Sequence, residues 1–168
     1  MQSLSIDRKF SDLPLAITMG EPGGINSEIF LKASKEISKI NNFIICDPSW
    51  IEKSLEFFNK KNSINILDQN LDIKENYINI MPTKRKVIFK LGKPNKRNNS
   101  AIIESIDKAI YLAKNKKVSG IVTLPIYKKN LIEDGFKFSG HTEYLSYKDK
   151  SDSLMVLMNK KLKVATVT

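Results

Sequence analysis

Short apolar runs alternate with amphipathic stretches along most of the chain. Apolar runs bounded by turn residues predict buried strands over residues 13–19, 43–47 and 118–124. Apolar positions at helical spacing predict helices from about residue 27, from Pro48 to about residue 58, and over residues 100–114. Strands that alternate with helices in this way indicate an α/β protein.

The first predicted helix has one apolar stripe, which we expect to pack on the sheet. The stripe consists of Ile29, Phe30, Ala33, Ile37 and Ile40. Asn26 or Ser27 is the expected N-cap, and Glu28 lies in the first turn, where an acid complements the helix dipole.

The rest of the chain is less regular. Residues 60–100 hold short apolar pieces between polar loops. A short helix is predicted over residues 128–134, ended by Gly135, and another begins near His141. Residues 154–158 and 162–167 read as two strands of a hairpin, joined by a polar turn.

Length and composition suit one soluble domain, or one lobe of a larger protein. The chain has 168 residues, 41% hydrophobic and 27% charged, which argues against intrinsic disorder. No apolar run approaches the roughly 18 residues that a membrane span needs. Residues 1–10 show no signal-peptide core, so we expect a cytoplasmic protein without a membrane partner. The single cysteine, Cys46, lies in an apolar run and is expected to be a buried structural thiol.

The net charge of +10 raises the question of nucleic-acid binding. The basic residues are spread along the chain, without interleaved aromatics and without a zinc-finger or RNA-binding motif. A solvated basic surface is therefore favoured, and no nucleic-acid partner is expected. A positive field would also attract a phosphorylated substrate.

Two turns after predicted strands carry candidate chemistry. Gly20-Glu-Pro-Gly-Gly24 places backbone amides ahead of a helix, which suits an anion, although a tight strand-to-helix turn explains it as well. It matches neither the dinucleotide fingerprint nor the nucleotide phosphate loop. Glu21 is either a functional carboxylate or an acid that complements the helix dipole.

The second turn holds the only histidine of the chain. His141 and Thr142 enter a predicted helix and could hold a phosphate or a hydroxyl, or Thr142 could simply cap the helix. Lys128 follows the strand over 118–124 and could bind an acidic substrate, or it could be solvated together with Lys129. One histidine cannot build the usual zinc site.

Both turns lie in longer motifs. The first reads Ile17-Thr-Met-Gly-Glu-Pro-Gly-Gly-Ile-Asn-Ser-Glu28, and the second reads Thr123-Leu-Pro-Ile-Tyr-Lys128 followed by Gly135-Phe-Lys-Phe-Ser-Gly-His-Thr-Glu143. These motifs, at their spacing, resemble those of the 4-hydroxythreonine-4-phosphate dehydrogenase family of vitamin B6 biosynthesis. The chain departs from the family pattern at Asn26, Ser27 and Tyr127.

The resemblance implies a three-layer fold like that of the isocitrate and isopropylmalate dehydrogenases. Residues 1–168 would form a single α/β unit, the N-terminal half of a two-lobed enzyme. By the same resemblance, the enzyme oxidises 4-hydroxy-L-threonine 4-phosphate with NAD or NADP and a divalent metal (Zn, Mg or Co), and the product loses carbon dioxide.

The resemblance also implies roles for particular residues. His141 and Thr142 would bind the substrate, with possible further contacts from Gly20, Glu21, Gly23, Gly24 and Lys128. The catalytic residues are not identified, and the chain would stop before the metal ligands. We therefore expect this half alone to be inactive and the full enzyme to be a homodimer. A dehydrogenase of a phosphorylated four-carbon sugar acid and a non-catalytic binding module are the alternatives.

Overall fold

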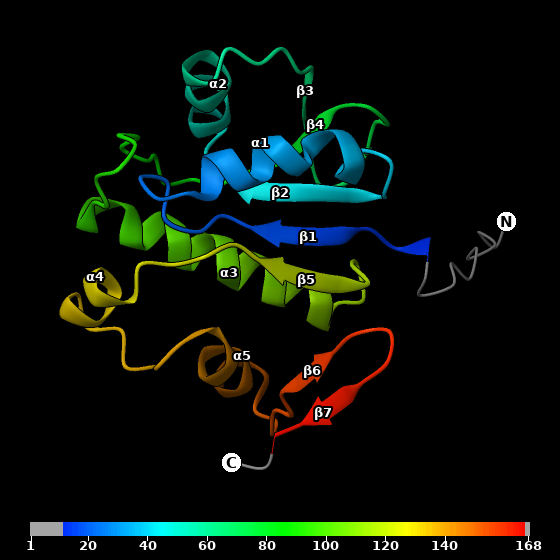
Figure 1. The fold of residues 1–168 in the computed structure, drawn as a ribbon, viewed down its shortest axis with the longest axis vertical. Helices are drawn as coiled ribbons and strands as arrows, with labels where there is room; N and C mark the ends of the chain where they lie inside the picture. Colours follow the sequence, from blue (N-terminus) through cyan, green and yellow to red (C-terminus); the bar gives the residue numbers. More distant parts are fainter. Residues whose placement is uncertain (1–11, 167–168) are drawn as a thin grey trace, which may run out of the picture.

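The computed structural model describes residues 12–166, which contain a parallel five-stranded sheet (Figure 1). Its strands are β1 (Leu15–Thr18), β2 (Asn42–Cys46), β3 (Ile64–Ile66), β4 (Ile78–Pro82) and β5 (Gly120–Thr123). The strand order is β3-β4-β2-β1-β5, and every pairing is parallel. The predicted α/β class is confirmed.

Helices connect the strands and cover both faces of the sheet. They are α1 (Asn26–Ile37), α2 (Pro48–Phe57), α3 (Asn99–Lys114), α4 (Lys128–Glu133) and α5 (His141–Asp149), with a short 3-10 turn, η2 (Lys96–Asn98), before α3. An antiparallel hairpin of β6 (Val156–Met158) and β7 (Lys163–Ala165) follows α5. The predicted hairpin is therefore confirmed, except for Val167, which lies outside the described residues, as do residues 1–10.

Alternation of side chains along the strands creates the layers. Ala16 and Phe43 lie on one face of the sheet and pack with Ala109 of α3. Ile17 and Ile44 point to the opposite face and pack with residues such as Trp50 of α2. Because both faces are covered, the central strands are buried on both sides, as is typical of parallel sheets. Cys46 is fully buried, as predicted, and burial raises its pKa well above the ordinary thiol value.

The prediction for the first helix was wrong in two respects. The N-cap of α1 is Ile25, without a side-chain capping bond. Asn26 and Ser27 lie inside the helix, and their buried side chains bond to other segments. In addition, Ile29 is 40% exposed, so the face that packs inward is a different one. That face includes Ser27, Phe30, Leu31 and Ser34.

Polar contacts with α2 explain the rotation of the helix. Ser27 Oγ accepts hydrogen bonds from Trp50 Nε1 and from Ser54 Oγ, both at 2.9 Å. Two of the inward positions are therefore serines with buried partners, and a count of apolar residues alone misses them. Among the described residues, no helix combines the length and the apolar character that crossing a membrane requires.

Candidate substrate site at the switch point of the sheet

The carboxyl ends of β1 and β5 mark the switch point of the sheet. From β1 the chain continues through α1 to β2 on one side, whereas β5, on the other side, is reached through α3 on the opposite face. Ligands in open α/β sheets bind in the crevice at such a point. The turn after β1 and the segment after β5 therefore meet where a site is expected.

Backbone contacts join these two segments directly. The Glu21 amide donates to the Pro125 carbonyl oxygen at 3.0 Å, and Asn26 Nδ2 donates to the same oxygen at 2.7 Å. A Cβ atom at Gly20 would lie 2.0 Å from that oxygen. Gly20 thus allows an approach of two backbones that no other residue permits.

Glu21 is buried inside the turn and is not in the first turn of α1; that position belongs to Glu28. Its Oε1 accepts from the Gly23 amide at 3.0 Å and from Asn98 Nδ2 at 3.3 Å. Burial raises the pKa of Glu21, and its Oε2 is buried without a hydrogen-bond partner in the structure. The interpretation of Glu21 as an acid of the helix dipole was wrong.

The amides of the turn are largely engaged within the turn itself. The Gly24 amide donates to the Glu21 carbonyl oxygen at 3.0 Å, and the Gly23 amide to the Glu21 carboxylate. A Cβ at Gly23 would meet the Lys93 carbonyl oxygen at 2.5 Å. The structure thus explains Gly20 and Gly23 by close packing, and the role of the glycines of this turn as anion contacts stays a prediction.

The second turn lies beside Lys128 at the same edge of the sheet. Gly140 is the N-cap residue of α5 and makes no side-chain capping bond, so the interpretation of Thr142 as the cap was wrong. A Cβ at Gly140 would lie 3.4 Å from Lys128 Nζ. His141, in the first turn of α5, has a buried Nε2 atom without a hydrogen-bond partner in the structure.

Aromatic packing and a charged pair fix α5 in place. Tyr144 OH donates to Asp107 Oδ1 of α3 at 2.7 Å, and Lys148 Nζ lies 3.0 Å from the same oxygen. Burial and the bond to Asp107 raise the pKa of Tyr144 to about 12. The Tyr144 ring also packs against Phe136 and Phe138, at centroid distances of 5.1 Å. These contacts hold the start of α5 in place, where His141 lies three residues before Tyr144.

The pKa of His141 gives a direct test of this arrangement. Burial lowers it, and the positive charge of Lys128 lowers it further. We expect Lys128→Met to raise the pKa of His141, and Lys129→Met, the matched control, to leave it nearly unchanged. Because the chain has one histidine, its imidazole resonances in an NMR pH titration need no assignment. If the pKa of His141 is the same in the Lys128→Met variant as in the parent chain, Lys128 does not lie close to the imidazole.

The same shift has a consequence for stability. Folded His141 binds a proton less readily than in the unfolded chain, where its pKa is about 6.5. The contribution of His141 to the free energy of unfolding is therefore present above about pH 6.5 and decreases as the pH falls through the folded-state pKa.

Several residues that frame the site had no signal in the sequence. Asn98 bonds Glu21 across 77 positions of the chain, and Asn26 reaches Pro125 across 99 positions. Asp107 meets Tyr144 across 37 positions. Such polar pairs become visible only when the fold brings them together.

Comparisons with known proteins show the family of the chain. The family of the pyridoxal phosphate biosynthetic protein PdxA matches residues 38–168, which is most of the chain and includes His141. The chain belongs to the PdxA family.

Relatives of known name share the family. A 4-hydroxythreonine-4-phosphate dehydrogenase from a Sulfurihydrogenibium species is 36% identical over 163 residues, which cover 92% of this chain and 48% of the relative. A crystal structure of the enzyme of that name from Klebsiella pneumoniae superposes with a TM-score of 0.80 at 27% identity, over 91% of this chain and 50% of that one. The chain spans about half the length of the PdxA relatives it matches.

The fold extends beyond these enzymes. A terephthalate 1,2-cis-dihydrodiol dehydrogenase from Burkholderia xenovorans superposes with a TM-score of 0.66 at 14% identity, which shows a shared fold alone.

The described residues hold no cluster of metal-ligating side chains, and two amides of the turn after β1 are already bonded. Within residues 12–166, no group of three or more His, Cys, Asp or Glu side chains is placed to hold a metal ion. The amides of Gly23 and Gly24, which would be the natural contacts of a cofactor phosphate, are bonded to Glu21.

Proposed function

We propose that the chain is the N-terminal half of a PdxA-type dehydrogenase that binds 4-hydroxy-L-threonine 4-phosphate. The observation that carries this proposal is the meeting of Lys128 with the first turn of α5 at the switch point of the sheet. The PdxA family match and the names of the relatives support the choice of substrate.

In this proposal three side chains hold the substrate. The Lys128 ammonium provides a positive charge for an anionic group, and its side chain is exposed. His141 provides a buried Nε2 atom with no competing partner in the structure. Its lowered pKa keeps the imidazole neutral at pH 7, so Nε2 can either donate or accept a hydrogen bond. Thr142, partly exposed beside it, adds a hydroxyl.

The full reaction would be oxidation of the substrate hydroxyl by NAD or NADP, followed by decarboxylation. NAD or NADP would supply a hydride acceptor for this oxidation, and a divalent metal would supply a Lewis acid for the substrate oxygen. We propose that the ligands of the metal lie outside these 168 residues, and that the full enzyme is a homodimer. The residues described here would contribute substrate binding and orientation.

Substitution of His141 tests the binding role. We expect His141→Ala to weaken binding of 4-hydroxy-L-threonine 4-phosphate by about 1.5–3 kcal/mol, the range for a hydrogen bond to a charged group. His141→Gln keeps a polar atom near the Nε2 position and should retain part of the affinity. Isothermal titration of the chain and both variants measures this, with circular dichroism as the control for folding.

Two results would contradict the proposal. One is equal affinity of the chain and His141→Ala for the phosphorylated substrate. The other is tighter binding of a phosphorylated four-carbon sugar acid, which would favour the related dehydrogenase instead.

A further inference from the structure

Helix α3 supports both of the helices that carry the candidate substrate residues. Lys128 is the first residue of α4, and His141 is the first residue of α5. The start of α3 bonds to α4, and its middle bonds to α5 through Asp107 and Tyr144. Figure 1 shows α4 near the amino end of α3. The position of Lys128 relative to His141 therefore depends on how each helix is fastened to α3.

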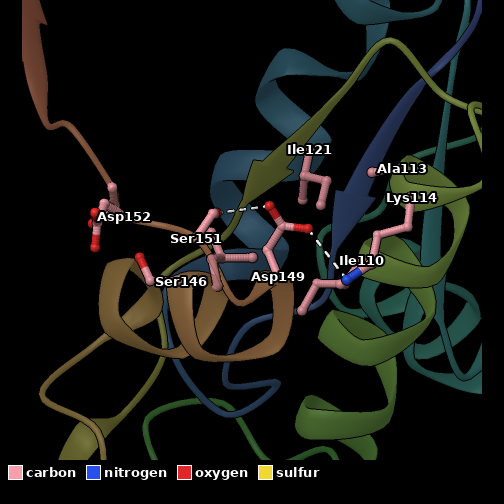
Figure 2. Close-up of a pocket in the computed structure, with 10 residues that line it drawn as sticks. Ile110, Ala113, Lys114, Ile121, Ser146, Asp149, Ser151 and Asp152 are labelled. Carbon is pink, nitrogen blue, oxygen red and sulfur yellow. Dashed lines mark hydrogen bonds and ion pairs between the residues drawn. The ribbon is translucent and has the colours of Figure 1, made fainter.

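The contacts between α3 and α5 extend along both helices. Beyond the bond from Tyr144 to Asp107, Lys114 Nζ lies 3.3 Å from Asp149 Oδ1 at the carboxyl ends of the two helices. Figure 2 shows this ion pair between the helices. About half of each side chain is exposed, so the pair contributes little free energy by itself. It adds a second polar contact that holds α5 against α3.

Two neighbouring asparagines at the start of α3 join α4 to the turn after β1. Asn99 Nδ2 donates to the Asn130 carbonyl oxygen at 3.0 Å and to Asp134 Oδ2 at 3.2 Å. Asn98 Nδ2 donates to Glu21 Oε1 at 3.3 Å. Both asparagines are almost completely buried, where a hydrogen bond is electrostatically stronger than in water.

These bonds close a ring of contacts around the start of α4. On one side, the Glu21 amide donates to the Pro125 carbonyl oxygen at 3.0 Å, three residues before Lys128. On the other side, the Glu21 carboxyl group leads through the two asparagines to the Asn130 carbonyl oxygen, two residues after Lys128. The backbone at Lys128 is therefore held from both directions, and Glu21 takes part in both.

We propose that Glu21 and Asn99 are positioning residues that hold Lys128 beside the first turn of α5. Their side chains are buried, so neither is open to a substrate. Binding groups keep a productive geometry when supporting residues with fixed hydrogen bonds hold them, and the ring supplies such support. The importance of this placement for substrate binding rests on the proposed function, whereas the placement itself does not.

The pKa of His141 measures the placement without any ligand. Burial lowers this pKa, and the positive charge of Lys128 lowers it further. We expect Asn99→Ala to release α4 and to raise the pKa of His141 toward its value in the Lys128→Met variant. In the Lys128→Met background, Asn99→Ala should have little further effect, because the charge that it positions is gone. An NMR pH titration of the single imidazole gives all four values.

Variants of Glu21 test the other part of the ring. Glu21→Ala removes the acceptor of the Gly23 amide and of Asn98 Nδ2, and it should raise the pKa of His141 as Asn99→Ala does. Glu21→Gln keeps an oxygen at the Oε1 position and should leave that pKa close to its value in the parent chain. If Glu21→Ala does not fold, Asn99→Ala and Glu21→Gln still give the comparison.

Asn79→Ala is the matched control for a general loss of stability. Asn79 is also a buried asparagine whose Nδ2 donates to two carbonyl oxygens, those of Lys74 and Tyr77. It lies in β4, which is separated from β5 by two strands. Urea unfolding should show a loss of stability in Asn79→Ala, and the pKa of His141 should stay as in the parent chain.

Calorimetric titration with 4-hydroxy-L-threonine 4-phosphate tests the consequence for binding. We expect Asn99→Ala to weaken binding about threefold or more, the scale of coupling within one hydrogen-bonded network. If the pKa of His141 rises in this variant but the affinity is unchanged, the placement of Lys128 stands and its role in substrate binding fails.

Three results would overturn the positioning role. The first is a pKa of His141 in Asn99→Ala equal to that of the parent chain. The second is an equally large rise when Asn99→Ala is introduced into the Lys128→Met background. The third is the same rise in the control Asn79→Ala, which would make the effect one of general stability.

Discussion

Gly20→Ala is expected to destabilise the fold by about 3 kcal/mol or more, because its methyl group has no space. The added Cβ would lie 2.0 Å from the Pro125 carbonyl oxygen and 2.2 Å from Asn26 Nδ2. Neither neighbour can yield easily. Pro125 O is a backbone atom that accepts two hydrogen bonds, and Asn26 is buried. The strain would separate the ends of β1 and β5 and so disturb the candidate site as well.

Gly24→Ala is the matched control from the same turn. Its Cβ would lie 3.3 Å from the nearest atom, the Glu21 carbonyl oxygen, so a shift of a few tenths of an ångström suffices. Urea unfolding of both variants gives the comparison. Equal stability of Gly20→Ala and the parent chain would show that the two strand ends are not in such close contact.

Asp47→Ala is expected to lower the free energy of unfolding by about 2–4 kcal/mol, through loss of a helix cap and of a buried acceptor. The fully buried Asp47 caps α2 by accepting from the Ser49 amide and hydroxyl, and it accepts from the Val87 amide at 3.0 Å. The exposed Lys86 Nζ lies 3.1 Å from Asp47 Oδ1. Removing the carboxylate would leave the Val87 amide buried without its acceptor.

The same carboxylate should make stability depend on pH. Burial alone would raise the pKa of Asp47, but the hydrogen bonds from Val87, Ser49 and Lys86 outweigh it and lower the pKa. A lowered folded-state pKa contributes stability above the unfolded value of about 3.9 and loses it as the pH falls through the folded value. Denaturant unfolding at pH 7 and at pH 3 should show a smaller loss for Asp47→Asn than for the parent chain, because the amide does not titrate in this range. Parallel curves would contradict this role.

Local pattern was sufficient to predict most of the fold. The strands around Ile17, Ile44 and Val122 are short apolar runs between turns, and the helices between them follow helical spacing. Gly135, with φ of 91°, ends α4 as its sequence position predicts. The pattern misplaced the inner face of α1, where Ser27 and Ser34 point inward.

The candidate site was predictable only in part. The family motifs singled out Lys128 and His141, and the structure places the two turns that carry them close together. Their role in substrate binding stays a prediction. The burial of Glu21 and its bond to Asn98 depend on segments 77 positions apart, and no local pattern encodes them. The interpretation of the glycines as anion contacts assumed that their amides are free. The structure shows that the Gly23 amide is bonded to the Glu21 carboxylate, which the sequence does not indicate.

The most direct test of the substrate site is an NMR titration of the 168-residue chain with 4-hydroxy-L-threonine 4-phosphate, followed on the imidazole of its single histidine. We expect a saturable shift of the His141 resonances and a rise of its pKa in the complex, because a bound anion favours the charged imidazole. Lys128→Met should require higher ligand concentrations for the same shift. Binding of the ligand that leaves the His141 resonances and pKa unchanged would contradict the proposed site.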